Sequence, residues 1–466
     1  MLHTMPPELK DMEELVEAIL IRLPPDEPEH LVRASLVCKP WCRLISDHGF
    51  RSRYRTFHKT PPMLGFLHNW PHHQVSPVRS PAPPSFISTT KFLPCDPWHR
   101  HSHRYDLFVQ DCRHGRGLLA YEDKDEKQCY LVVWDPMTGH ATKLWKPLPY
   151  DRYSSTRAAV LCAVDGCDHG ACHLGPFLVV FVNLHEEGLA TATVYSSETN
   201  TWSSPASLHL GFRKYELYLS DMATLLTGDA IHFLFARDDL AGLLKYDLGT
   251  SCLSEVELPA IAMYDDYSPV LIALEGDGRL GIAVLDYMNS IYLWWREEGP
   301  DQVATWTQPT VIDLKNHLHL RHPDALSQLV GSIEGTVIIF VITNTGTYKI
   351  DLKLLSSEKL KLTSKFSVSE DDLHTHFPYL SFYNPPVAQT EKLADSGEGE
   401  TGSSDEESVE SEAGSSGEES GESEAGSSEE YSEESEAGTS DEEMEESDVG
   451  SSDEERCKRK CSWIQR

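Results

Sequence analysis

Two different spacings of apolar residues divide the chain. Between residues 8 and 58 apolar positions recur at helical intervals, as at Leu15, Ile19 and Leu23. From about residue 106 to 386, short β-branched and aromatic strings alternate with Gly, Asp, Asn and Pro turns. The first pattern predicts amphipathic helices and the second predicts strands. Residues 59–105 are a Pro- and His-rich linker between them, and an acidic polar segment covers residues 391–466.

The N-terminal segment predicts three short helices. Pro24 and Pro25 end the first, because proline has no amide hydrogen to donate and restricts the residue before it. The second helix carries the apolar positions Leu31, Ala34, Leu36 and Val37. Pro40 opens the third, whose apolar face is formed by Trp41, Leu44 and Ile45. So small a core is marginal alone, and its remaining apolar side chains are expected to meet a partner surface.

This segment resembles the F-box, the three-helix module that docks onto the Skp adaptor of cullin-RING ubiquitin ligases. The string "VCKPW" at residues 37–41 and the apolar spacing before it carry the likeness. The usual Leu-Pro at the start of the first helix is replaced by Asp11-Met12. A generic helical hairpin packed on the next domain is the alternative. The resemblance implies that the residues that meet or support the adaptor are Leu15, Ile19, Leu20, Leu23, Pro24, Leu31, Val37, Cys38, Trp41 and Leu44. Trp41 is the expected anchor, since buried Trp dominates many interfaces.

The β-rich zone repeats one unit, an apolar strand with an aromatic residue, a polar turn and a second strand. Its copies cover residues 131–145, 192–205, 243–256 and 291–306, with a weaker copy at 347–362. The aromatic anchors are Trp134, Tyr195, Tyr246, Trp294 and Tyr348, spaced by 61, 51, 48 and 54 residues. A period near 50 with several strands per unit predicts a β-propeller.

Six blades are expected, with seven as the rival count. Residues 62–70 and 85–92 are candidates for the first blade, and residues 377–385 for the strand that closes the ring. This zone, 106–386, resembles the kelch-like propellers that follow F-boxes in a large plant family, especially in grasses. The strings "CRHGRGLLAY", "LVVWDPMTG" and "PFLVVFV" carry the likeness. The expected fold class is therefore multidomain α+β, with an F-box at residues 8–58, an all-β propeller and a disordered tail.

Charge is concentrated in the tail. The chain has a formal net charge of −34, but residues 393–455 hold 26 acidic and no basic residues. The rest of the chain has 48 acidic and 40 basic residues, so it shows no excess of positive charge of the kind that nucleic-acid-binding proteins have. Four consecutive twelve-residue copies fill residues 403–450, and their composition predicts disorder. The Ser and Thr residues of these copies suit an acidophilic kinase. The alternative is that the tail only keeps the protein in solution. The basic residues 456–461 are a candidate nuclear signal.

The cysteines and the apolar strings bear on the compartment. Eleven cysteines, an odd number without framework spacing, predict reduced thiols. Acidic residues and Arg22 interrupt the N-terminal apolar run, and the strings at 177–182 and 337–342 are too short to span a membrane. We therefore expect a soluble protein of the nucleus and/or cytoplasm, with no membrane partner.

The candidate metal and catalytic motifs are weak. Cys162, Cys167, Cys172, His169 and His173 are ligand types that suit tetrahedral zinc. Their spacing does not match the short zinc knuckles, so a blade loop with reduced thiols is favoured. Histidines in Pro-rich segments lack the rigid support that a metal needs. The sequence offers no phosphate loop, nucleophile elbow or catalytic triad, and predicts no cofactor and no metal.

The expected function is that of a non-catalytic substrate receptor of an Skp–cullin–F-box ubiquitin ligase. The F-box would dock the Skp adaptor, and through it cullin, while the propeller binds an unknown protein target. Loop tyrosines among charges are the expected target-binding residues, namely Tyr215, Tyr218, Tyr264 and Tyr267. The alternative is an acidic-tailed propeller that binds or chaperones basic partners. A propeller oxidoreductase is a third possibility and would need a metal.

Overall fold

The computed structural model describes the greater part of residues 8–382. The described ranges are 8–69, 85–95, 105–123, 128–147, 155–170, 172–185, 188–211, 217–237, 240–259, 269–274, 278–286, 288–298, 304–307, 309–314, 327–362 and 375–382. The chain divides into a first unit, which holds every described residue, and a second unit of residues 388–462. The second unit, with the acidic repeats, lies outside the described residues.

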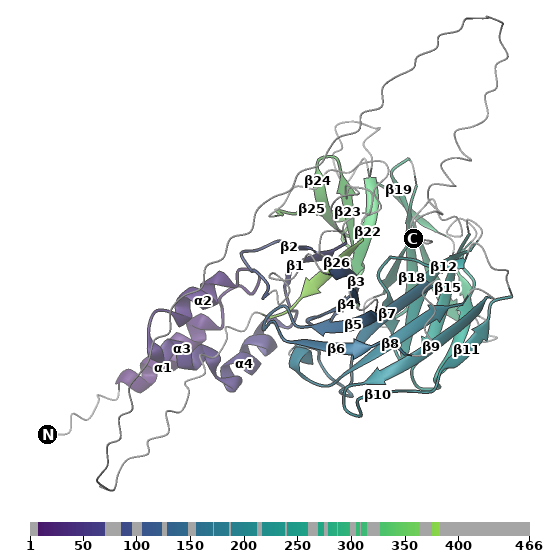
Figure 1. The fold of residues 1–466 in the computed structure, drawn as a ribbon. Helices are drawn as coiled ribbons and strands as arrows, with labels where there is room; N and C mark the ends of the chain where they lie inside the picture. Colours follow the sequence, from purple (N-terminus) through teal and green to yellow (C-terminus); the bar gives the residue numbers. More distant parts are fainter. Residues whose placement is uncertain are drawn as a thin grey trace, which may run out of the picture. The chain divides into compact units, whose positions relative to one another are not determined.

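Four helices open the described chain: α1 (Glu8–Leu20), α2 (Glu29–Ser35), α3 (Lys39–Ser46) and α4 (His48–His58) (Figure 1). As expected, α1 ends before Pro24, and Pro40 lies in the first turn of α3. The structure adds α4 to the three expected helices. The Asp47 carboxylate accepts a hydrogen bond from the Phe50 amide at 3.0 Å and caps this helix. None of the helices in the described ranges is both long and apolar enough to cross a membrane.

The helices share one small core with a residue from the far end of the described chain. Its buried members are Leu20, Leu31, Ala34, Ile45, Phe50, Tyr54 and Phe382. The Tyr54 ring lies edge-on to the Phe382 ring, with centroids 6.2 Å apart. The Tyr54 hydroxyl donates a hydrogen bond of 2.9 Å to the Leu23 carbonyl. The N-terminal helices therefore depend on Phe382 for part of their core.

The described strands of the first unit form six antiparallel sheets. The first contains β2 (Ser85–Ser88), β1 (Met63–His68) and β26 (His376–Leu380). The second contains β3 (Tyr105–Arg113), β4 (Arg116–Asp123), β5 (Gln128–Trp134) and β6 (Ala141–Trp145). The third contains β7 (Ser155–Cys162), β8 (Phe177–Leu184), β9 (Leu189–Ser196) and β10 (Thr201–Trp202), with β11 (Ala206–His209) on β9.

The other three sheets follow the same order along the chain. The fourth contains β12 (Leu217–Leu219), β14 (Ala230–Arg237), β15 (Leu240–Asp247) and β16 (Cys252–Val256), with β13 (Leu225–Thr227) on β14. The fifth contains β17 (Val270–Ala273), β18 (Leu280–Leu285), β19 (Ser290–Glu298) and β20 (Ala304–Trp306), with β21 (Thr310–Asp313) on β19. The sixth contains β22 (Ser327–Ile333), β23 (Ile338–Thr343), β24 (Gly346–Asp351) and β25 (Ser356–Lys359).

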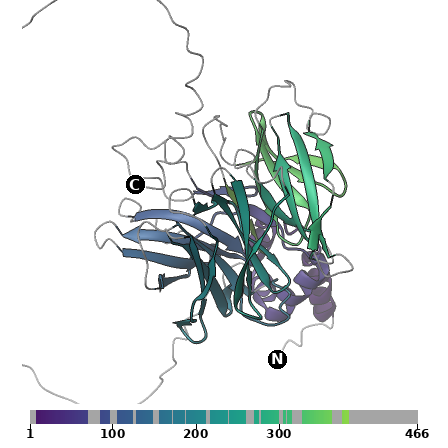
Figure 2. The same ribbon diagram turned by 90° about the vertical axis from the view of Figure 1, so that its right-hand side faces the viewer.

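The sheets are the blades of a six-bladed β-propeller, which confirms the expected fold class. Their inner strands touch in a closed circuit, because β26 contacts β3 and β22, β7 contacts β3 and β12, and β17 contacts β13 and β22. Figure 2 shows the last blade, in green, set at a large angle to the blue strands of the earlier blades. Apolar clusters fill the space between neighbouring blades. All five aromatic anchors of the sequence repeat lie on the third strand of a blade: β5, β9, β15, β19 and β24.

The ring closes by pairing the two ends of the propeller segment. Strand β26 runs antiparallel to β1, with Leu67 opposite Phe377 and His68 opposite His376. Residues 62–70 and 377–385 are the segments that the sequence predicts for the first blade and for the strand that closes the ring. Gly65 on β1 permits the close approach of β2, because a Cβ at this position would clash with the Ile87 carbonyl oxygen. The first and last strands of the propeller thus belong to one sheet.

Candidate functional site

Five of the described large apolar side chains in the N-terminal helical segment are exposed, and one of them, Phe57 near the end of α4, is 53% exposed. Leu15 and Ile19, one helical turn apart on α1, are 64% and 63% exposed. Leu36 and Val37, which follow α2, are 79% and 63% exposed. We call Leu15, Ile19, Leu36 and Val37 the exposed F-box residues. Large apolar side chains that a small domain leaves in water commonly mark a surface for a partner.

Most of the other predicted adaptor residues lie deeper. Leu20 and Leu31 are buried in the helical core, while Leu23, Trp41 and Leu44 are half-buried against it. Pro24 is half-buried and Cys38 is exposed. Trp41, the expected anchor, therefore packs partly against the helical core and is partly exposed.

Leu36 was not among the predicted adaptor residues. It caps the C-terminus of α2, whose buried positions are Leu31 and Ala34. The signal for its exposure was in the sequence, since a seven-residue helix with those two positions inside turns Leu36 away from the core.

A buried ion cluster occupies the inner strands of the propeller. Arg113 on β3 pairs with the carboxylates of Asp111 at 2.7 Å and Glu334 at 2.5 Å, and donates to the Thr224 carbonyl at 3.0 Å. Burial alone would lower the pKa of Arg113, but the two carboxylates raise it above its usual value. Asp111 also accepts a hydrogen bond from the Val160 amide. The cluster therefore joins the second, third, fourth and sixth blades.

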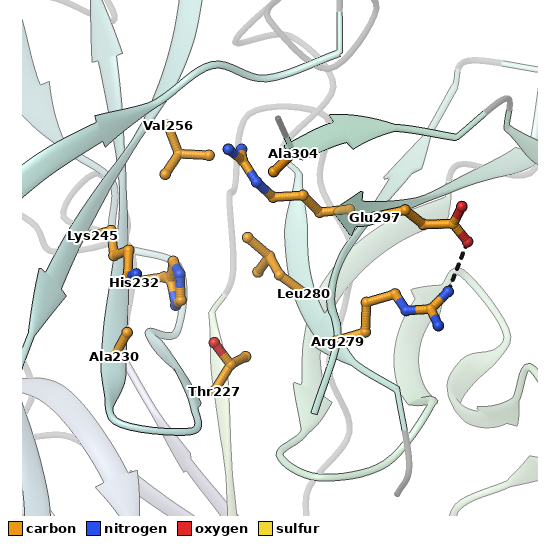
Figure 3. Close-up of a pocket in the computed structure, with 10 residues that line it drawn as sticks. Thr227, Ala230, His232, Lys245, Val256, Arg279, Leu280, Glu297 and Ala304 are labelled. Atoms are coloured by element: carbon orange, nitrogen blue, oxygen red, sulfur yellow. Dashed lines mark hydrogen bonds and ion pairs between the residues drawn. The ribbon is translucent and has the colours of Figure 1, made fainter. Parts of the chain in front are cut away.

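The described structure contains a recess of about 680 Å³ between the fourth and fifth blades (Figure 3). In Figure 3 His232 and Lys245 project from one side, while Arg279 and Glu297 lie on the other, joined at 2.7 Å. Arg296 also lines the recess. Burial lowers the pKa of His232 to about 4, so its imidazole is neutral at physiological pH. With three basic side chains and one carboxylate, this recess is suited to an acidic group of a bound molecule.

The predicted target-binding tyrosines are only partly visible. Tyr215, Tyr264 and Tyr267 lie outside the described residues. Tyr218 is half-buried on β12, opposite Ala236, and so lies on the innermost strand of its blade rather than in a loop. The four residues remain a prediction.

The loop after β7 gathers four of the cysteine and histidine side chains that the sequence singled out. The ligand atoms of Cys162, Cys167, His169 and Cys172 all lie within 4.8 Å of one another. Burial and the neighbouring thiols of Cys162 and Cys167 raise the pKa of Cys172 to about 12. Burial lowers the pKa of His169. His173 is turned away and binds the Asp135 carboxylate at 3.0 Å.

Comparison with known proteins agrees with the N-terminal assignment. Residues 4–53 match the F-box domain family, so the chain contains an F-box followed by a six-bladed propeller. It is similar to a plant protein named "F-box protein At2g07140" from Arabidopsis thaliana, with 25% identity over 312 residues that cover 65% of this chain and 76% of that protein.

Two solved structures are also similar to the chain, at low identity. AofleA from Arthrobotrys oligospora has 11% identity and a TM-score of 0.34, over 57% of this chain and 73% of that one. A puromycin-hydrolyzing peptidase of Mycobacterium tuberculosis has 12% identity and a TM-score of 0.34, over 55% of this chain and 39% of the peptidase. The chain therefore spans well under half of the peptidase.

Proposed function

We propose that this chain is the substrate-recognition subunit of an Skp–cullin–F-box ubiquitin ligase. F-box domains typically bind Skp-type adaptors and thereby cullin. The observation that carries the proposal is the set of exposed F-box residues, Leu15, Ile19, Leu36 and Val37, within the segment that matches the F-box. Their apolar surface is available to an adaptor without any rearrangement of the helical core.

In this function the chain performs no chemistry itself. Its F-box docks the adaptor and its propeller holds a protein target, which raises the effective concentration of the target near the ubiquitin-loaded enzyme. Phe382 supports this arrangement, because it ties the helical core to the strand that closes the propeller. A fixed connection between the two binding parts limits how far the bound target can move from the adaptor.

The recess between the fourth and fifth blades is our proposed contact for the target, together with the predicted tyrosines. Lys245, Arg279 and Arg296 give it a net positive charge beside Glu297. An acidic segment of the target would therefore be attracted to it, with an affinity that falls as salt increases.

Adaptor capture tests the proposal. The double variants Leu15→Ser/Ile19→Ser and Leu36→Ser/Val37→Ser remove apolar surface from exposed positions and so leave the helical fold unchanged. Fully burying a Leu, Ile or Val side chain contributes about 1.5–3 kcal/mol, and the least exposed of these four is 63% exposed, so each pair is expected to weaken the adaptor complex at least ~20-fold.

The measurement is the dissociation constant of each purified variant with a plant Skp adaptor. The control is Val311→Ser/Leu354→Ser, since these propeller residues are 54% and 72% exposed and lie far from the F-box in sequence. The control should bind as the unchanged chain does. Full binding by both F-box double variants would refute the proposal.

A further inference from the structure

Four metal-binding side chains meet beside the propeller strand β7. Cys162 ends β7, Cys167 and His169 lie in the loop that follows, and Cys172 begins the short 3-10 helix η2 (Cys172–Leu174). All their ligand atoms lie within 4.8 Å of one another, and Cys172 Sγ is 3.6 Å from His169 Nδ1. No pair of these cysteines forms a disulfide.

These separations are close to those of a zinc coordination shell. A tetrahedron with Zn–S bonds of about 2.3 Å and a Zn–N bond of about 2.0–2.1 Å has S···S edges of about 3.8 Å and S···N edges of about 3.6 Å. The Cys172–His169 separation already has the latter value. The other donor separations are at most 4.8 Å, so each exceeds its tetrahedral edge by about 1.2 Å or less.

We propose that Cys162, Cys167, His169 and Cys172 bind one zinc ion. Three sulfur ligands and one imidazole are a common donor set of structural zinc sites. With four protein ligands the shell has no position left for water or substrate, so the ion stabilises the fold and takes no part in catalysis. This inference does not depend on the proposed ubiquitin-ligase function.

A buried arginine compensates the charge of the site. Three thiolates, a neutral imidazole and Zn²⁺ together carry one net negative charge. Arg116 on β4 is 1% exposed, and it donates hydrogen bonds to the carbonyls of Cys172, His173 and Gly175. Its guanidinium also interacts with the Cys162 side chain. Arg116 therefore fixes the backbone at one ligand while placing a positive charge beside the thiolates.

Further contacts orient the ligands. The His114 ring stacks on the His169 ring, with centroids 3.7 Å apart and an angle of 8° between the planes. The amides of Val164 and His169 donate to the sulfur atoms of Cys162 and Cys167 at 3.4 Å, and these contacts fix the direction of each sulfur. Gly166, with a φ of 64°, turns the chain between these two cysteines.

The proposed ion would fasten a loop that contacts the F-box. Gly170 lies between His169 and Cys172 in the sequence, and a Cβ at this position would come 3.2 Å from Cδ of Arg55 on α4. The loop therefore packs directly against the last F-box helix. Zinc binding would hold this loop of the propeller in the conformation that contacts α4.

The test is the metal content of the full chain, purified under reducing conditions, loaded with zinc and dialysed. We expect one zinc per chain by elemental mass spectrometry, and less than a tenth of that for Cys162→Ser and Cys172→Ser. Cys252→Ser is the matched control, because Cys252 is an exposed thiol on β16, and it should keep its zinc. Cobalt(II) in place of zinc should give the absorption of a tetrahedral thiolate complex in the unchanged chain.

The cobalt spectrum decides the question even if the cysteine variants fail to fold. A chain that binds neither zinc nor cobalt overturns the proposal. Equal zinc in Cys172→Ser and in Cys252→Ser also overturns it. A disulfide between two of the three cysteines in protein handled without air, detected by peptide mass spectrometry, would assign the cluster a different role.

Discussion

Replacing Phe382 with alanine is expected to unfold the F-box helices while the propeller stays folded. Phe382 is only 1% exposed and belongs to the same apolar cluster as Leu20, Ile45 and Phe50. Phe382 belongs to the segment after β26, so this part of the helical core is supplied by a residue outside the helices.

The magnitude follows from the size of the helical core. Truncating a buried phenylalanine to alanine costs about 3–5 kcal/mol, through lost burial and the cavity left behind. A core this small rarely supplies more than about 3–5 kcal/mol of net stability. The loss is therefore comparable to the whole stability of the F-box. The clusters between the blades do not contain Phe382, so they keep their packing.

Hydrogen exchange measured by mass spectrometry gives the readout by segment. In Phe382→Ala the amides of α1 to α4 should lose protection, while the inner amides of β8 and β14 should keep it. The matched control is Phe377→Ala on β26, whose side chain packs between the first two blades. It should loosen those blades and leave the helices protected. Unchanged exchange in α1 to α4 of Phe382→Ala would refute the reasoning.

Two further predictions concern buried charge. Arg113→Met should destabilise the propeller by about 3–5 kcal/mol in urea unfolding, because Asp111 stays buried without its cation, and Asp111→Asn/Arg113→Met should recover part of the loss. Equal stability of all three proteins would contradict this. The folded-state pKa of His232 is about 4, below the unfolded value of about 6.5. Between these two pH values the unfolded chain takes up a proton that the folded chain does not. The free energy of unfolding therefore has its full value above pH 6.5 and declines as the pH falls to 4. The decline should be about 1.4 kcal/mol per pH unit. In His232→Gln the free energy of unfolding, measured between about pH 4 and pH 6.5, should lack this part of the pH dependence.

The repeated parts of the fold were predictable because their signals are local. Helical spacing and the proline stops identify the N-terminal helices from neighbouring residues alone. The aromatic anchors Trp134, Tyr195, Tyr246 and Trp294 are buried in the same strand of successive blades, so a period near 50 follows from one repeated packing requirement. The sequence predicted no helix at the position of α4, whose start depends on the capping geometry of Asp47.

Contacts between distant residues were not predictable in the same way. Arg113 and Glu334 are 221 residues apart, and nothing in the sequence pairs them. Phe382 looks like any aromatic residue in a strand-rich segment until its contact with Tyr54 is known. The residues of the cysteine cluster are near one another in sequence and were singled out from it, but the contact of Arg116 from the second blade with their loop was not. Sequence patterns report periodic burial, whereas these features arise from tertiary pairing.

The closure of the ring has a consequence for how the protein is made. Residues 376–382 are synthesised after every other described residue, yet they supply the inner strand of the first blade and the Phe382 side chain of the F-box core. Domains generally fold as units as the chain emerges from the ribosome. A chain cut short before residue 376 lacks both contributions at once. Truncated translation products would therefore have neither a closed propeller nor a stable F-box, and could not occupy a partner in place of the finished protein.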